Sequence, residues 1–110
     1  MFTYKAIVTR VVDGDTFDAE VDLGFRTYRR ERFRLLDVDT PERGQRGFDE
    51  CTDRLRQLLI ECQDPDGRII IKSRKTGKFG RWLAAIMHPS MSEISSMLKL
   101  FMLENGYVEG

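Results

Sequence analysis

Hydrophobic and acidic residues alternate most regularly between positions 17 and 23. Phe17, Ala19, Val21 and Leu23 are apolar, and the three residues between them are all acidic. A period of two is typical of a strand that buries one face and exposes the other. The pattern therefore predicts a half-buried strand over this segment.

The segments on either side predict two further strands. Residues 4–12 are rich in β-branched side chains, and residues 27–38 are interpreted as the third strand. The pair Asp13-Gly14 is a strong hairpin signal between the first two segments, and Gly24 supports a turn between the second and third. Three strands joined by short turns form an antiparallel meander.

A loop marked by Pro41, Gly44 and Gly47 comes next, and helical spacing follows it. Between positions 48 and 62, apolar residues recur every three or four positions, which predicts an amphipathic helix of about four turns. These residues are Phe48, Cys51, Leu55, Leu58, Leu59 and Cys62.

The last part of the chain predicts two strands, 68–72 and 82–87, and then a second helix. Ser90 and Glu93 have the spacing of a capping box, which predicts that they open this helix. Gly106 suits its C-terminal cap. The side chains expected to face inward are Ile94, Met97, Leu98 and Phe101.

The order of three strands, a helix, two strands and a helix predicts an OB-fold. This is an α+β fold built on a small five-stranded Greek-key β-barrel, here with a helix after the third strand and a C-terminal helix. Pattern alone leaves other α+β arrangements open. A length of 110 residues fits one domain spanning 1–110.

Charge is balanced overall but unevenly distributed along the chain. The 18 basic and 18 acidic residues give a formal net charge of zero. Arginines crowd residues 26–34, basic residues crowd 72–81, and acidic residues crowd 13–22. Such a bipolar chain can hold a phosphate backbone on one side without a high overall charge, which keeps nucleic acid open as a partner.

The positions of the two cysteines and the presence of a single histidine argue against a disulfide and against a zinc site. Cys51 and Cys62 lie eleven positions apart on the predicted helix, about 16 Å along its axis, which is too far for a disulfide. With His88 as the single histidine, the usual His and Cys ligands cannot assemble a zinc cluster.

The sequence predicts no membrane partner, because no apolar run reaches the roughly 18 residues of a membrane span. The first residues lack the hydrophobic core of a signal peptide. We therefore expect a cytoplasmic monomer, or a secreted protein if a leader was removed.

Three short segments carry candidate chemistry: Val-Asp-Gly-Asp-Thr at 12–16, Phe-Arg-Leu-Leu-Asp-Val-Asp-Thr-Pro-Glu at 33–42, and Lys-Phe-Gly-Arg at 78–81. Each segment alone is better explained as a turn, a loop or a solvated charge than as part of a site. Together they contain oxygen ligands for a hard cation such as Ca²⁺, namely the carboxylates of Asp15 and Asp39 and the backbone carbonyl of Thr40.

The same segments contain the other groups that phosphodiester cleavage requires. Glu42 can accept a proton from an attacking water. Arg34 and Arg81 offer planar guanidinium groups for phosphate oxygens and for the charge of the transition state. Strand alternation places Arg34 and Asp39 on opposite faces, so their convergence requires a bulge or bend.

In order and spacing, these segments resemble the signature of the staphylococcal nuclease (thermonuclease) family, over nearly the whole chain from about Tyr4 to Tyr107. The resemblance implies a calcium-dependent phosphodiesterase, an endonuclease that cuts DNA and RNA, prefers single-stranded or flexible substrate and leaves 3′-phosphate ends. The residues to which it assigns these roles are Asp15, Asp39 and the Thr40 carbonyl as calcium ligands, Arg34 and Arg81 as catalytic arginines, and Glu42 as the proposed base.

The resemblance has departures as well as matches. Phe79 stands where the family commonly has a tyrosine that helps to hold the 5′ phosphate, and the final helix of longer relatives is absent from this sequence. Lys72, Lys75 and Lys78 are further candidates, with Phe79, for substrate binding.

An OB-fold nucleic-acid-binding module without catalysis is the alternative. Such modules usually lack several of the acidic and arginine positions, all of which are occupied here. A protein-interaction barrel would need an exposed apolar surface, and the sequence shows none in the strands.

Overall fold

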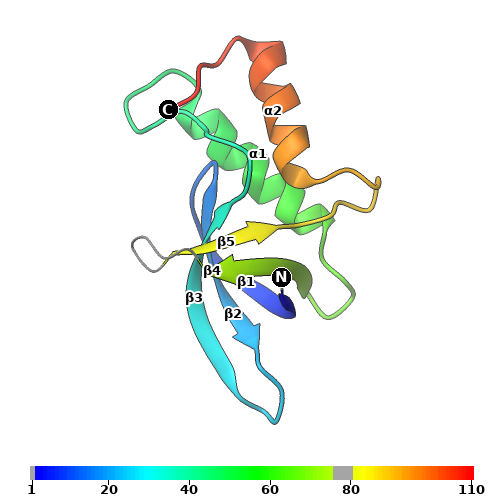
Figure 1. Ribbon diagram of the computed structural model, residues 1–110. Coiled ribbons are helices and arrows are strands. Elements are labelled where there is room, and N and C mark those ends of the chain that lie inside the picture. The colour runs from blue at the N-terminus through cyan, green and yellow to red at the C-terminus, as the bar shows by residue number, and fades with distance from the viewer. Residues whose placement is uncertain (1, 76–80) are drawn as a thin grey trace.

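Five strands close into a barrel that carries two helices at one end (Figure 1). The computed structural model describes residues 2–75 and 81–110. The elements in chain order are β1 (Phe2–Asp13), β2 (Thr16–Asp22), β3 (Tyr28–Leu35), α1 (Phe48–Glu61), β4 (Ile69–Lys75), β5 (Trp82–Ala85) and α2 (Ile94–Asn105).

The order of strands around the barrel is β1-β2-β3-β5-β4, and β4 pairs with β1 to close it. The first three strands form the predicted antiparallel meander. β3 and β5 run parallel, with Phe33 opposite Trp82 and Arg34 opposite Leu83, because α1 and β4 come between them in the chain. This topology confirms the α+β OB-fold barrel.

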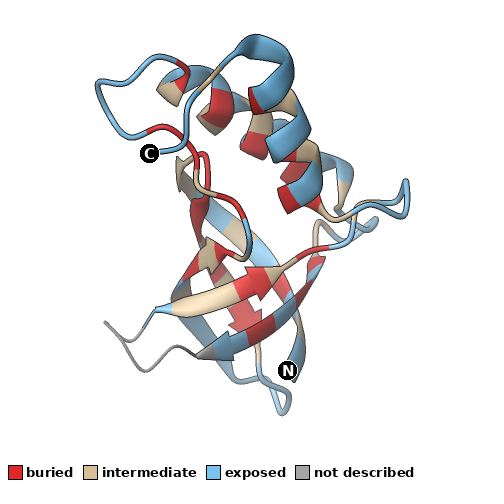
Figure 2. Cartoon of the chain, turned by 45° about the horizontal axis from the view of Figure 1, so that its top comes forward, coloured by how far each residue is buried: buried red, intermediate tan, exposed pale blue. Residues whose placement is uncertain are grey.

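The core lies inside the barrel and under α1. Figure 2 shows buried residues along the inward faces of the strands and helices. Phe17 of β2 and Phe33 of β3 stack inside the barrel with their ring centroids 5.5 Å apart. α1 buries the apolar positions that its spacing predicts, among them Leu55 and Leu58, because these residues share one helical face.

The third strand is shorter than its sequence predicts. β3 ends at Leu35, and Asp37 adopts a left-handed backbone conformation with φ of 63°. Aspartate is one of the few residues that adopt this conformation at modest cost. The chain therefore turns away from the barrel before Asp39, where simple alternation predicted a strand as far as Val38.

The predicted capping box of the second helix is wrong. α2 begins at Ile94 with Glu93 as its N-cap, and no side chain caps it. Ser90 lies in the preceding turn, where its hydroxyl is 2.7 Å from Nδ1 of His88. The Nε2 atom of the same histidine lies 2.8 Å from Glu61, so this contact fixes the turn against the end of α1.

Some apolar side chains are exposed on the strands, contrary to the prediction from sequence. Ile7 of β1 and Ile70 of β4 are about half exposed on the outside of the barrel.

Both cysteines are free, as their separation predicted. Burial raises the pKa of each thiol, Cys51 and Cys62, to about 11, so both are protonated at neutral pH. Within the described part of the chain, no helix has the length and apolar character needed to cross a membrane.

Candidate active site

The hairpin between β1 and β2 places the first predicted ligand, Asp15. The backbone N–H of Asp15 donates to Oδ1 of Asp13 at 3.1 Å, which forms a tight turn around Gly14. A β-carbon at Gly14 would lie 2.7 Å from Oγ1 of Thr40 and 2.9 Å from Cβ of Cys51. Glycine is therefore required here for close approach, and it lets the turn pack directly against the loop that contains Thr40.

The Asp15 side chain is buried, with 7% of its residue surface exposed. Its Oδ2 accepts a hydrogen bond of 3.0 Å from the backbone N–H of Thr40, and its Oδ1 accepts one of 3.0 Å from the Thr16 hydroxyl. These bonds hold the carboxylate in one orientation. They also join two segments that lie 25 positions apart in the sequence.

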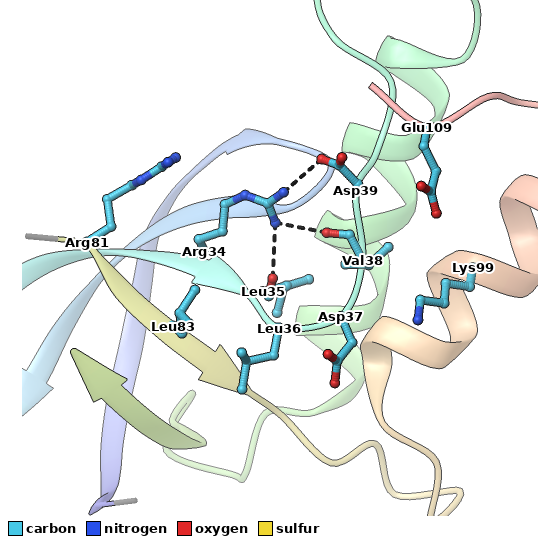
Figure 3. Close-up of a pocket in the computed structure, with 10 residues that line it drawn as sticks. All are labelled: Arg34, Leu35, Leu36, Asp37, Val38, Asp39, Arg81, Leu83, Lys99 and Glu109. Carbon is cyan, nitrogen blue, oxygen red and sulfur yellow. Dashed lines mark hydrogen bonds and ion pairs between the residues drawn. The ribbon is translucent and has the colours of Figure 1, made fainter. Parts of the chain in front are cut away.

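Arg34 bonds the end of β3 to the segment that follows it (Figure 3). Its Nη1 donates to the carbonyl oxygens of Leu35 and Val38, at 3.0 and 2.8 Å. Its Nη2 lies 2.8 Å from Oδ1 of Asp39 and 3.5 Å from Oδ2 of Asp15. The bend at residue 37 makes this possible, because it brings Asp39 back toward the strand position of Arg34.

One more carboxyl group belongs to this cluster. Burial, and next the side-chain interaction with Asp15, raise the pKa of Asp13 above its usual value. Desolvation of the charged form is therefore the main cause, and the neighbouring Asp15 carboxylate adds to it. In the sequence, Asp13 is distinguished only as part of the hairpin signal Asp13-Gly14.

Arg81 reaches the same pocket from the position just before β5. The pocket has a volume of about 550 Å³ and is lined by Arg34, Asp39 and Arg81, with residues of the 35–38 segment between them. Arg81 immediately precedes Trp82, which pairs with Phe33, so strand alternation places Arg81 and Arg34 on the same outer face. The Trp82 ring lies toward the core instead, and its Nε1 donates to Glu31 at 3.1 Å.

Glu42, the predicted base, is exposed in the loop that follows Thr40. Its backbone N–H donates to Oε1 of Gln45 at 2.6 Å. The described residues that line the pocket of Arg34 and Arg81 do not include Glu42. A β-carbon at Gly110 would lie 2.8 Å from Cγ of Glu42, so the C-terminal residues pack beside it.

The predicted substrate-binding residues lie on or beyond β4. Lys72 is exposed on β4 opposite Ala85, three positions along the strand from the end nearest Arg81. The backbone of Lys75 pairs with Trp82 at that end. Lys78 and Phe79 lie outside the described residues, as does the side chain of Lys75.

Two pocket residues come from segments that carried no sequence signal for the site. Lys99 of α2 and Glu109, which follows α2, both line the pocket with Arg34 and Arg81. They lie far along the chain from the three predicted segments. Their place in the pocket depends on how α2 packs against the rest of the molecule, and a short motif does not encode such packing.

A cation at this site would be held mainly by oxygen atoms. Across residues 2–75 and 81–110, no group of three His, Cys, Asp or Glu side chains is arranged to hold a metal ion. Asp15 and Asp39 nevertheless both place a carboxylate oxygen near one nitrogen, Nη2, of the Arg34 guanidinium group. The pair therefore already faces a cationic group, and the Thr40 carbonyl, the third predicted donor, lies against the C-terminal Gly110.

The chain is 28% identical over 86 residues to a protein named micrococcal nuclease from Shigella flexneri. It is a distant relative of that nuclease. The aligned stretch covers 78% of this chain and 44% of the relative, so the chain spans less than half the length of the protein it matches. No protein-family model matches the chain.

Proposed function

We propose that this protein is a calcium-dependent nuclease of the staphylococcal nuclease type, which hydrolyses phosphodiester bonds in DNA, RNA or both. The observation that carries the proposal is the position of Arg34, which contacts Asp15 and Asp39 and shares one pocket with Arg81. The distant similarity to a micrococcal nuclease supports the same reaction class.

Calcium suits the donors that this site offers. Asp15, Asp39 and the Thr40 carbonyl would hold it, and this small protein contribution leaves positions for water and a phosphate oxygen. A bound calcium ion supplies Lewis-acid polarisation of the phosphate and a fixed position for the water. The bonds from Thr40 and Thr16 keep the Asp15 carboxylate oriented before any ligand arrives.

The arginines supply the charge that recognises a phosphodiester. Nη1 of Arg34 donates to two backbone carbonyls and Nη2 donates to Asp39, so a phosphate would bind at Nε and would take the place of Asp39 at Nη2. Arg81 approaches from the neighbouring strand and binds a second phosphate oxygen. Their positive charges stabilise the extra negative charge of the transition state, where such donors contribute most.

Glu42 is the proposed acceptor of the proton lost by the attacking water. The water oxygen bonds to phosphorus while the bond from phosphorus to the 5′ oxygen breaks. The released 5′ oxygen takes up a proton, and the other product keeps a 3′ phosphate. Because the pocket is open at the surface, we propose a preference for single-stranded or flexible substrate.

A non-catalytic binding module is the second candidate, and one observation favours it. Arg34 donates to the carbonyls of Leu35 and Val38 and to Asp39, so it also acts as a clamp at the end of β3. In that case its positive charge would serve the fold, and the barrel would bind nucleic acid without cutting it.

A cleavage assay separates the two candidates. Purified protein is incubated with end-labelled single-stranded DNA, duplex DNA and RNA, each with calcium and with excess chelator. A preparation of the Arg81→Ala variant, made in the same way, controls for contaminating nucleases. We expect calcium-dependent cutting that is fastest on single strands, with products that carry 3′ phosphates.

Cutting in excess chelator would reject the calcium assignment. Binding without cutting under all conditions would favour the non-catalytic module. Equal cutting by the Arg81→Ala preparation would identify a contaminant as the source of activity.

A further inference from the structure

The pocket that contains the two arginines extends across to α2. Figure 3 shows Lys99 projecting from α2 toward the segment that links β3 to the following loop, with Arg34 and Arg81 on the barrel side. All three residues line the same pocket of about 550 Å³. This volume lies within the range of pockets that enclose ligands larger than a single phosphate group.

Lys99 differs from Arg34 in its surroundings. Arg34 bonds two carbonyls and a carboxylate, whereas Lys99 is exposed and forms no ion pair with any residue in 2–75 or 81–110. A lysine ammonium is a compact point charge on a flexible stem, which suits contact with a phosphate whose position varies.

Apolar side chains form part of the pocket between these charges. Leu36 and Leu83 are each partly exposed and line the pocket. Leu83 lies opposite Arg34 in the parallel pair, so its side chain is on the outer face of the barrel. An apolar surface with cationic groups beyond it matches a nucleotide chain, in which sugars and bases separate charged phosphates.

We propose that Lys99 binds a phosphate next to the one that is cut, so that the substrate strand passes from the barrel face onto α2. This inference rests on the proposed nuclease function and adds a substrate contact to it. Lys99 then strengthens binding only of strands that have more than one phosphate.

Two carboxylates of the pocket oppose this contact. Asp37 and Glu109 are both exposed and line the same pocket. A carboxylate repels a phosphate, so replacing Glu109 by glutamine should strengthen the binding of a longer strand. The proposal therefore predicts changes of opposite sign for Lys99→Ala and Glu109→Gln.

The test compares a thymidine dinucleotide, which has one phosphodiester, with a short oligothymidylate under the same calcium conditions. We expect Lys99→Ala to raise KM for the oligothymidylate by about tenfold more than for the dinucleotide, the size of one charged hydrogen bond. Glu109→Gln should lower KM for the oligothymidylate. Lys5→Ala is the matched control, because Lys5 is an exposed lysine outside this pocket.

A binding measurement provides a second readout that does not depend on turnover. Anisotropy of a labelled oligothymidylate, titrated at several salt concentrations, gives the slope of log Kd against log salt. Loss of one phosphate contact should reduce that slope by about 0.7 for a single strand. Lys5→Ala should leave the slope unchanged.

The outcomes separate this proposal from the nuclease proposal. If the wild-type protein cuts neither substrate, the nuclease function fails. If it cuts both, and Lys99→Ala behaves like Lys5→Ala in KM and in salt slope, then Lys99 is not a phosphate contact. Equal losses on the dinucleotide and the oligothymidylate would also reject a contact with an adjacent phosphate.

Discussion

The buried carboxylate of Asp15 accepts a hydrogen bond of 3.0 Å from the backbone N–H of Thr40, 25 positions further along the chain. One side chain thereby holds the loop that also contains the proposed carbonyl ligand, Thr40. Asp15 consequently has two roles, which an ordinary alanine substitution would confound. Removing it takes away both a proposed ligand and a buried hydrogen bond.

We expect Asp15→Asn to weaken calcium binding by at least tenfold while the fold is retained. Asparagine keeps an oxygen that can accept the Thr40 N–H, but it lacks the negative charge that a hard cation prefers. Titration calorimetry with calcium measures the affinity, and urea unfolding measures the stability. Asp15→Ala is the comparison, and its loss of a buried hydrogen bond should lower stability by about 1–3 kcal/mol. Unaltered calcium affinity in the Asn variant would remove Asp15 from the ligand set.

Arg34→Lys and Arg81→Lys should each lower kcat by about 10²- to 10³-fold, because lysine keeps the charge but lacks the bidentate geometry. The two variants should differ in stability. Arg34 donates to the carbonyls of Leu35 and Val38 at the end of β3, so Arg34→Lys should lower the melting temperature measurably, and by more than Arg81→Lys at the exposed position before β5. Single-turnover cleavage and thermal melting provide the two readouts. Normal kcat in either variant would exclude that arginine from the reaction.

Gly47→Ala should destabilise the protein by about 1–3 kcal/mol. Gly47 has φ of 93°, and a β-carbon there would lie 2.6 Å from Cδ1 of Tyr107. Gly44→Ala is a close control, because Gly44 has φ of 91° with no atom within 4 Å of the added carbon. The difference between their unfolding free energies therefore isolates the contact with Tyr107 from backbone strain. Equal values would mean that the ring moves aside without cost.

The pair formed by Asp18 and Arg32 across β2 and β3 should stabilise the protein only above acidic pH. Arg32 donates from Nε to Oδ1 at 2.8 Å and from Nη2 to Oδ2 at 3.2 Å, and these hydrogen bonds hold the pKa of Asp18 below its usual value of 3.8. The contribution is therefore present above pH 3.8 and is lost as pH falls through the lowered pKa of the folded state.

Because both side chains are partly exposed, this pair should contribute only about 0.5 kcal/mol at neutral pH. A double-mutant cycle with Asp18→Asn and Arg32→Gln, measured by urea unfolding at neutral pH and again near pH 2, checks this. Coupling that persists at the lower pH would contradict the assignment to the ionised carboxylate.

Local patterns predicted the strands and helices because each pattern depends on near neighbours. The period of two in residues 17–23 and the helical spacing after Phe48 both correspond to elements of the structure. The prediction of a capping box was wrong because it considered only near neighbours in the sequence. The spacing of Ser90 and Glu93 is right, but Ser90 bonds His88 in a separate turn. A two-residue match does not encode that competing contact.

The candidate site was partly predictable from sequence. The motifs named Arg34 and Asp39, and alternation showed that a bend must join them, but it did not locate the bend. The left-handed backbone at Asp37 provides it. The close approach of Gly14 to Thr40 and the presence of Lys99 in the pocket depend on tertiary packing, which sequence spacing does not describe.

The shortness of β5 has a consequence for how activity is lost. This strand has only four residues, and its parallel pairing with β3 is what brings Arg81 beside Arg34. Opening of β5 alone would separate the arginines while the β1–β3 meander and α1 stay folded, which is a sub-global unfolding event. The amide of Leu36, which donates to the carbonyl of Ala84 at 2.9 Å, would then exchange its hydrogen before the amides of the meander. Heating should therefore abolish the proposed nuclease activity below the temperature at which the barrel melts.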